Sequence, residues 1–347
     1  MFSKNLKYYR LLRGMTKKEL AAKANVTAMA ITNYEKGERM PNMDTLKALA
    51  AALNVRVSDF LTVRNENIVF DHCEFRKNTY LSAFRQEFIR ESVEEYFGRF
   101  MTAVEILGGD VLPEAPKCHA ITLSENIEEN AMALREHLGF AIDGPIEDLI
   151  GKLENKGFLI YECDLDDGHF SGMNGFVNER PYIVLNSNMN AERNRSTAVH
   201  ELAHLMFQWP KDMTEKLMEQ VATAISGAFL FPRSDVLREL GVHRSAITND
   251  MVTVAKEYGI SMMLLVKRAE QCNIISHSIA KDFFIKASKA GWRTNEPSRI
   301  EPEELTLFRQ LVFRAVNESE ISIQRGAELL QTPYAEIQEM CCVTEVE

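Results

Sequence analysis

The chain has 347 residues, 46% of them hydrophobic and 26% charged, a composition typical of a globular protein with room for two or three domains. It contains no run of roughly 18 apolar residues that would span a membrane, and its first residues lack the apolar core of a signal peptide. We therefore expect a cytoplasmic protein without a membrane partner. Because the cysteines show no CxxC spacing, we expect no disulfide framework or zinc ribbon but reduced thiols at Cys73, Cys118, Cys163, Cys272, Cys341 and Cys342.

Charge is distributed unevenly along the chain. Residues 1–60 carry eleven Lys and Arg against five Asp and Glu, a net charge of +6, so the remaining residues carry −16 of the total of −10. A basic segment joined to an acidic body predicts a nucleic-acid-binding module attached to a part that does not itself bind nucleic acid.

The first sixty residues predict a small helical bundle. A T-x-x-E capping box formed by Thr16 and Glu19 places a helix over 17–23. A turn at 25–26 then leads into a second helix over 27–34. Apolar residues recur at helical spacing after it and close the bundle: Leu46, Leu49, Ala50 and Leu53.

This order of capped helix, turn and second helix, followed by an E-x-G-x-x-x-P motif over 35–41, resembles the phage-repressor-type (XRE) helix-turn-helix family along nearly the whole segment. In that fold the second helix of the motif lies in the major groove of double-stranded DNA. The resemblance implies base-reading residues and phosphate-contacting residues: Ala28, Met29, Thr32 and Asn33 for the bases, and Lys17, Lys18, Lys36 and Arg39 for the phosphates. The Asn33 amide can pair with adenine, whereas Ala28 and Met29 can only touch thymine methyl groups or leave room.

A bundle used only for protein contacts is the alternative, and the uneven charge argues against it. Repressors of this kind usually bind paired half-sites of an operator, so we expect a homodimer.

The middle of the chain predicts an α+β domain. Residues 63–79 show no helical period and are expected to be a linker, whereas apolar residues at three- and four-residue steps predict a long amphipathic helix over 80–107. Two shorter helices and two strands are predicted next: helices over 125–138 and 145–157, and strands over 157–163 and 180–186. The segment between the strands, 164–175, is rich in turn residues.

The sequence HELAH over 200–204 predicts a metal site. His200 and His204 lie four residues apart on one helical face, where both rings can bind one ion. Zinc suits imidazole, and catalytic zinc sites commonly use three protein ligands and a water, so a third ligand is needed. Glu219, fifteen residues after His204, and Glu215, one turn earlier, both have workable spacing. The alternative is a pair of histidines satisfied in a core without metal.

An HExxH motif followed by E-x-x-A-x-x-x-A/S-x-x-L-L-x-P resembles the ImmA/IrrE metallopeptidase family. The second motif is matched by Glu219, Ala222, Ser226, Phe229, Leu230 and Pro232. The segments LREHLGF, GPIEDL, LENKG, YIVLN and GISMMLLVKRAEQCNII occur in the order usual for the family, so the resemblance spans about residues 80–285. It implies a zincin-like domain in which His200, His204 and Glu219 bind Zn²⁺ and Glu201 is the general base.

The chemistry of such a site is consistent on its own terms. A zinc ion with an open position lowers the pKa of bound water toward 7, and Glu201 can take the proton as hydroxide attacks a peptide carbonyl. No oxyanion donor besides the ion can be assigned; by residue type alone the candidates are His243, Tyr182 and Tyr258.

The chain departs from the family at Ser196, where an aromatic residue is usual, and at Ala203, where glycine is usual. Both departures concern packing and access to the cleft more than metal binding. We expect a DNA-binding transcriptional regulator whose zinc-dependent endopeptidase domain cleaves a regulatory, repressor-like protein. The alternative is a non-proteolytic regulator or antitoxin-like factor that uses the zincin-like domain to sense or bind a partner such as a toxin.

Two amphipathic helices are predicted in the tail, over 302–316 and 323–340, the second interrupted at Pro333. They can dock on the catalytic domain, mediate dimerisation or bind a partner. The predicted fold is thus mainly α with a small β-sheet, in four parts: a helix-turn-helix domain over 1–62, a linker over 63–79, a metallopeptidase domain over 80–290 and a C-terminal helical region over 291–347.

Overall fold

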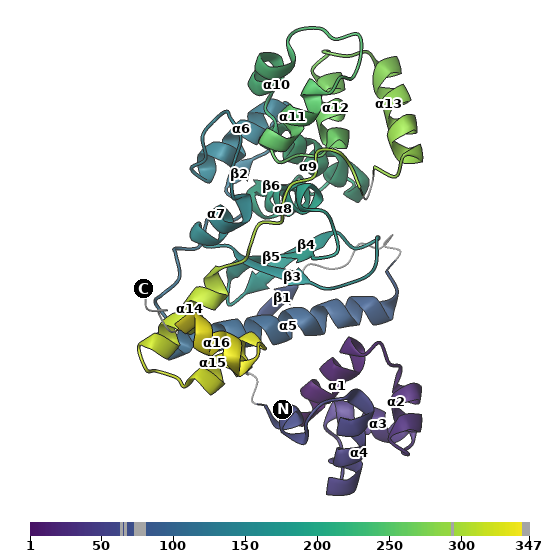
Figure 1. Cartoon of the computed structure of the whole chain (residues 1–347), viewed down its shortest axis with the longest axis vertical. Helices are drawn as coiled ribbons and strands as arrows, with labels where there is room; N and C mark the ends of the chain where they lie inside the picture. Colours follow the sequence, from purple (N-terminus) through teal and green to yellow (C-terminus); the bar gives the residue numbers. More distant parts are fainter. Residues whose placement is uncertain (63–64, 66–67, 73–80, 293–294, 342–347) are drawn as a thin grey trace. The chain divides into compact units, whose positions relative to one another are not determined.

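The computed structural model describes residues 1–62, 65, 68–72, 81–292 and 295–341. Helices dominate these residues and the strands are short (Figure 1), which confirms a mainly α fold with a small β-sheet. The chain contacts divide it into two compact units. The first comprises the N-terminal helices up to Val69, the long helix α5 and the last helices from Leu311. The second comprises strand β1 and Val111–Gln310.

The N-terminal helices form a bundle of their own: α1 (Phe2–Leu12), α2 (Lys17–Lys23), α3 (Ala28–Lys36), α4 (Met43–Leu53) and the 3-10 helix η1 (Val57–Leu61). The predicted capping box is confirmed, because Thr16 Oγ1 accepts from Glu19 N (3.2 Å) and Thr16 N donates to Glu19 Oε2 (2.7 Å). Such a cap satisfies backbone groups that the helix itself leaves unpaired. The apolar side chains facing inward are fully buried: Leu6, Leu20, Ile31, Leu49, Leu53 and Phe60.

The first unit continues with α5 (Ala83–Ile106) and, after the second unit, α14 (Leu307–Asn317), α15 (Ile323–Leu330) and α16 (Tyr334–Cys341). Helix α5 contacts α1 through Lys7, whose Nζ lies 2.8 Å from Glu87 and 2.9 Å from Glu91. It contacts the C-terminal helices through Arg99, which donates to the Leu329 carbonyl. From the sequence, α5 is predicted to lie at the start of the metallopeptidase domain over 80–290. In the structure α5 falls in the first unit instead, because its contacts are with helices near both ends of the sequence.

The tail helices differ from their predicted bounds. Helix α14 begins at Leu307 and not at 302, and the Glu154 carboxylate accepts from the backbone N–H groups of Thr306 (3.0 Å) and Leu307 (3.2 Å) at its start. The predicted interruption at Pro333 is confirmed, since Pro333 separates α15 from α16.

The second unit contains a four-stranded sheet formed by β1 (Phe70–His72), β3 (Leu159–Cys163), β4 (Gly172–Val177) and β5 (Arg180–Asn186). The strand order is β1-β4-β5-β3, with β3 parallel to β5 and the other pairs antiparallel. Sequence reasoning missed two strands: β1 lies within the segment 63–79 that is interpreted as a linker, and β4 begins in the segment 164–175 that is described as rich in turn residues. The linker residues 63–64, 66–67 and 73–79 lie outside the described residues.

The glycines of β4 explain the second error. A Cβ on Gly175 would lie 2.4 Å from Tyr182 Oη and 2.6 Å from the Asp71 carbonyl oxygen, so only glycine lets the three strands approach this closely. Glycine is depleted in strands in general, which is why the sequence pattern here indicates a turn.

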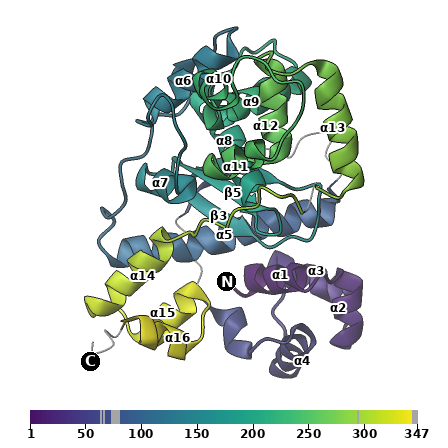
Figure 2. The same cartoon turned by 45° about the horizontal axis from the view of Figure 1, so that its top comes forward.

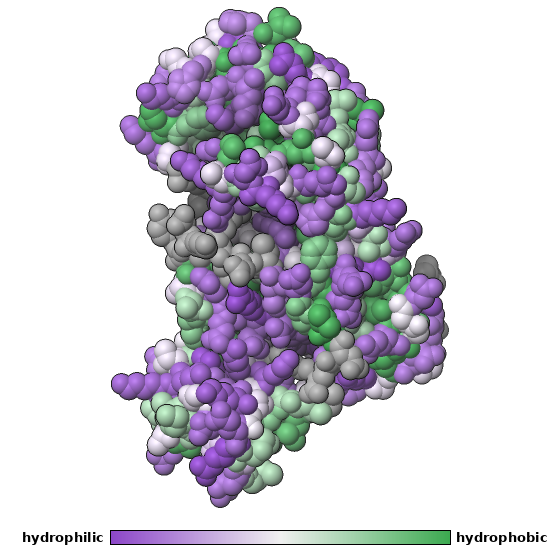
Figure 3. Space-filling view, turned by 180° about the vertical axis from the view of Figure 1, so that it is seen from behind, coloured by the Kyte–Doolittle hydropathy of each residue, from purple (hydrophilic) through white to green (hydrophobic). Residues whose placement is uncertain are grey.

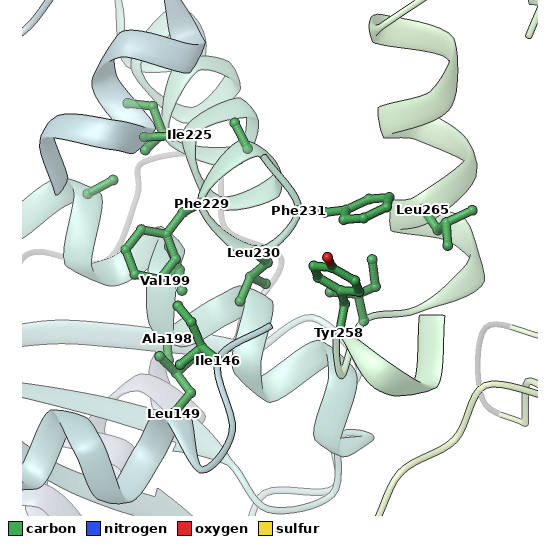
Figure 4. Close-up of a cluster of buried hydrophobic side chains, with 14 of the residues drawn as sticks. Ile146, Leu149, Ala198, Val199, Ile225, Phe229, Leu230, Phe231, Tyr258 and Leu265 are labelled. Atoms are coloured by element: carbon green, nitrogen blue, oxygen red, sulfur yellow. The ribbon is translucent and has the colours of Figure 1, made fainter. Parts of the chain in front are cut away.

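Helices pack against this sheet and against one another in the rest of the second unit: α6 (Ile127–His137), α7 (Leu149–Asn155), α8 (Ala191–Met206), α9 (Glu215–Leu230), α10 (Arg233–Leu240), α11 (Asp250–Glu257), α12 (Met262–Gln271) and α13 (His277–Lys289). The short strands β2 (Ile121–Thr122) and β6 (Phe207–Gln208) pair in parallel. Figure 4 shows Ala198 and Val199 of α8 in one buried cluster with Phe229 and Leu230 of α9. The two helices are therefore joined by core packing.

Carboxylates hold the segment that follows α13 to α7 and α8 within the second unit. Glu192 of α8 is fully buried and accepts from Ile300 N (2.5 Å). Glu303 accepts from Ile150 N (2.9 Å), the second residue of α7, and pairs with buried Arg195 of α8. Losing one partner of a buried pair leaves a desolvated charge, so these contacts hold the N-terminal half of α8 firmly.

Hydrophilic side chains cover most of the face drawn in Figure 3, with hydrophobic ones in scattered patches. Within the described ranges no helix is long and apolar enough to cross a membrane. Cys118, Cys163 and Cys272 form no disulfide within the described part of the chain, and Cys73 and Cys342 lie outside it.

We expect Gly175→Ala to destabilise the second unit by about 1–3 kcal/mol, because the added methyl group overpacks the contact with Tyr182 and the β1 backbone. The midpoint of urea denaturation, followed by circular dichroism, measures the change. Gly168→Ala is the matched control, since no atom lies within 4 Å of the methyl group it would add. Equal effects of the two substitutions would show that close approach at Gly175 is unimportant.

Candidate functional site

Helix α3 has one buried and one accessible face. Ile31 and Tyr34 are buried against the bundle, which leaves the opposite face to solvent. That face presents the four predicted base-reading residues: Ala28 and Met29, which are exposed, and Thr32 and Asn33, which are half-buried. The Thr32 hydroxyl donates to the Ala28 carbonyl (3.1 Å), whereas no such backbone contact occupies the Asn33 amide among the hydrogen bonds of the described residues.

The residues predicted to contact phosphates differ in their exposure and in their ion pairs. Lys18, Lys36 and Arg39 are exposed. Lys17 is half-buried, with Nζ 3.3 Å from Oε2 of Glu35. Glu35 is the first residue of the E-x-G-x-x-x-P motif, and its other partner is buried Arg10 of α1. The motif glutamate therefore holds the reading helix to α1, and Lys17 shares in that contact.

The candidate metal centre lies between α8 and α9, which face each other along one stripe on each helix. The stripe of α8 is Ser196, His200 and His204; that of α9 is Glu219, Thr223 and Ser226. These spacings of three and four residues keep each set on one face. Ser226 Oγ donates to the Ser196 carbonyl (2.7 Å), and Thr223 Oγ1 lies 3.3 Å from His200 Nδ1. The two contacts fix the register of the helices and the orientation of the His200 ring.

Three ligand atoms converge at the end of this stripe. His200 Nε2 lies 3.1 Å from His204 Nε2 and 3.1 Å from Glu219 Oε2, and His204 Nε2 lies 3.2 Å from Glu219 Oε1. Tetrahedral bonds of about 2.0–2.1 Å place neighbouring ligand atoms about 3.3 Å apart. Two imidazoles and a carboxylate at this spacing suit zinc. Glu215, the competing third ligand, is the exposed first residue of α9 and is not in the cluster.

Electrostatics keep Glu219 in the form that binds metal. Burial acts to raise the pKa of Glu219, but hydrogen bonds and charge from His200 and His204 outweigh it and hold the pKa well below its usual range. The histidine side chains are 14% exposed and that of Glu219 is 21% exposed, so the cluster is partly shielded yet reachable from solvent.

Glu201 is buried beside the cluster, where a residue of β4 contacts it. Its Oε2 accepts from Asn174 Nδ2 at 2.7 Å, and only 4% of Glu201 is exposed. Gly172 lets β4 approach α8, because a Cβ there would lie 2.6 Å from Thr197 Cγ2. Sequence reasoning missed Asn174, since the surrounding SGMNGF indicates a turn, and the sequence carries no other signal for it.

The three residues considered as oxyanion donors are placed elsewhere. The Tyr182 hydroxyl lies within the sheet, 2.6 Å from His72 Nδ1, and that of Tyr258 accepts from Arg238 (2.7 Å). His243 lies in the loop between α10 and α11. None of them belongs to the metal-ligand cluster.

Comparison with protein-family models gives two matches. Residues 6–60 match the helix-turn-helix model, and residues 153–270 match that of the IrrE N-terminal-like domain. A comparison with curated proteins gives no match. The second match contains β3 to β5, α8 and α9, and so includes every residue of the cluster. The predicted joining of an XRE-type helix-turn-helix to an ImmA/IrrE-type domain is confirmed.

We expect purified protein to contain about one zinc ion per chain, because three ligands at tetrahedral spacing bind this ion tightly. His204→Ala and Glu219→Ala should each lose it, and mass spectrometry of the metal content measures the loss. Glu215→Ala is the matched control and should keep the ion. Retention of zinc in Glu219→Ala together with its loss in Glu215→Ala would contradict the ligand assignment.

Proposed function

We propose, from the presence of a helix-turn-helix domain and an IrrE N-terminal-like domain in one chain, that this DNA-binding regulator is a zinc-dependent endopeptidase that cleaves a regulatory, repressor-like protein. The observation that carries the proposal is the convergence of His200, His204 and Glu219 next to a buried glutamate. These three residues would hold zinc. When bound, zinc lowers the pKa of water and polarises a carbonyl group.

Glu201 is the residue that we assign to proton transfer. It follows His200 directly, so its carboxylate lies on the same helix as two of the ligands. Asn174 donates to Oε2 and so fixes the orientation of the carboxylate, and we assign Oε1 to take the proton from water and pass it to the leaving amine. A positioned base next to the reacting atoms requires no reorganisation when the substrate binds.

Thr223 acts on the site indirectly, through its contact with His200. Its hydroxyl lies at hydrogen-bonding distance from Nδ1 of His200, the ring nitrogen opposite the ligand atom. Such a contact sets the tautomer and the ring orientation of a ligating histidine. The cluster is thus held by contacts within the pair α8 and α9.

The helix-turn-helix domain would bind operator DNA as a homodimer, with the boundary near residue 62 that the sequence predicts. Tethering the peptidase domain to DNA raises its local concentration near other proteins on the same site. A repressor bound there would be the natural substrate, which is why we propose this class of protein.

We expect Glu201→Gln to retain fold and zinc but to lose cleavage by about 10²–10⁴-fold, because the amide cannot accept the proton. Mass spectrometry of a proteome-derived peptide library, incubated with zinc-loaded protein, measures the cleavage. Asn174→Ala should reduce cleavage less, since it removes only the positioning contact. Equal cleavage by wild type and Glu201→Gln, or none by either, would favour the non-proteolytic regulator.

For DNA binding, we expect Asn33→Ala to reduce affinity for the operator by about 1–3 kcal/mol and to relax sequence preference at one base pair. Lys18→Ala should weaken binding to all sequences alike and reduce the salt dependence, because a phosphate contact carries no sequence information. Fluorescence anisotropy with operator and scrambled duplexes at several salt concentrations separates the two effects. An unchanged sequence preference in Asn33→Ala would remove this residue from the readers.

A further inference from the structure

The last three helices repeat the arrangement of the first three. Helices α14, α15 and α16 follow one another with lengths that differ by at most one residue from those of α1, α2 and α3. The hydroxyl of Ser322 caps α15 as that of Thr16 caps α2, each accepting a backbone N–H three residues later at 3.2 Å. The turn after each second helix contains one left-handed residue, Gln331 at φ 56° and Asn25 at φ 52°. Thr16 and Ser322 are 306 positions apart, and so are Asn25 and Gln331.

A backbone hydrogen bond is also repeated 306 positions later. Val26 N donates to the Ala21 carbonyl at 2.9 Å, and Thr332 N donates to the Ala327 carbonyl at 3.1 Å. Both alanines are buried, at 3% and 6% exposure. A small residue at this position lets the two helices of a helix-turn-helix pack closely, and the C-terminal helices share this feature with the N-terminal motif.

The core of the C-terminal helices supports the equivalence. Ile337 of α16 is 1% exposed, and Ile31, its equivalent in α3, is 0% exposed. Gly326 provides the close contact, because a Cβ there would lie 2.9 Å from Val316 and 3.6 Å from Ile337. Few residues are identical between the two copies, so only the backbone and the burial reveal the repeat.

The charges of the two motifs are opposite. Residues 16–36 carry four Lys and two Glu, a net charge of +2, whereas residues 322–341 carry one Arg and three Glu, a net charge of −2. The positions equivalent to the four base-reading residues are all exposed: Tyr334, Ala335, Gln338 and Glu339. Glu336 is exposed beside them. Carboxylates on this face repel phosphates, so the second motif is unsuited to DNA.

The same face carries one large apolar side chain, that of Tyr334, which is 47% exposed on α16. The DNA-reading helix α3 presents Met29, which is 67% exposed, among the exposed lysines of its motif. Tyrosine and methionine are enriched at protein interfaces, and opposite charges around them select the partner.

We propose that the acidic face of α16 binds the DNA-reading face of α3 in a second copy of the chain, so that DNA and the second copy compete for one surface. This goes beyond the proposed peptidase activity and does not depend on it. Contacts of the first unit favour the exposure of α16, because α15 is the helix that α5 holds, through Gln331 (2.9 Å from Glu95) and the Leu329 carbonyl.

The test is analytical ultracentrifugation of the full chain without DNA. We expect self-association that weakens as salt rises, since charge pairing between exposed groups is screened. Glu336→Lys/Glu339→Lys should abolish the salt-dependent part of this association and leave any operator-binding homodimer intact. Glu136→Lys/Glu257→Lys is the matched control, because it changes net charge equally at exposed positions of the second unit and should associate like wild type. A random-sequence 20-bp duplex should dissociate the wild-type assembly.

A mixture of two variants with opposite charge changes tests whether a loss of association reflects misfolding. Lys18→Glu/Lys36→Glu should fail to associate alone, as should Glu336→Lys/Glu339→Lys, but an equimolar mixture of the two should associate again. Restoration requires both variants to be folded and the two faces to meet. Unaltered association in the α16 variant, absence of association in wild type, or no restoration in the mixture would each overturn the proposal.

Discussion

The register of α8 against α9 is the constraint on which the candidate site depends. The hydrogen bond from Ser226 to the Ser196 carbonyl lies at one end of the facing stripes, and the cluster of His200, His204 and Glu219 lies at the other. A one-residue slip would turn Glu219 about 100° away from the histidines. The core between the helices prevents this slip, since Ala198, Val199 and Phe229 are fully buried. The packing of α8 against α9 therefore positions the metal ligands.

The sheet contributes to the candidate site through β4, the strand whose sequence least resembles a strand. Strand β4 approaches α8 because Gly172 has no side chain, and this approach brings Asn174 to Glu201. The same strand meets β1 and Tyr182 at Gly175. Two glycines that lower the strand propensity of this segment are thus what allow it to reach the site. Local preference and tertiary fit conflict here, as is common at functional sites.

This conflict marks the limit of what the sequence predicts. The capping box at Thr16 and the spacing of His200 and His204 depend on neighbours within one helical turn, so the sequence predicts both. The choice of Glu219 over Glu215 depends on how α9 faces α8, and the place of β4 depends on contacts with Tyr182, which lie outside any local pattern. The likeness of α14–α16 to α1–α3 is hidden for a similar reason, because it lies in burial and backbone conformation.

The two units differ in how strongly their contacts resist rearrangement. In the second unit Arg195 is buried and pairs with Glu303, which is 13% exposed, and removing one partner of a buried ion pair costs about 3–5 kcal/mol. In the first unit α1 contacts α5 through Lys7, which pairs with Glu87 (44% exposed) and with Glu91 (11% exposed). The exposed pair with Glu87 contributes about 0–1 kcal/mol. This pair is therefore easier to break than the buried contacts that hold the N-terminal half of α8.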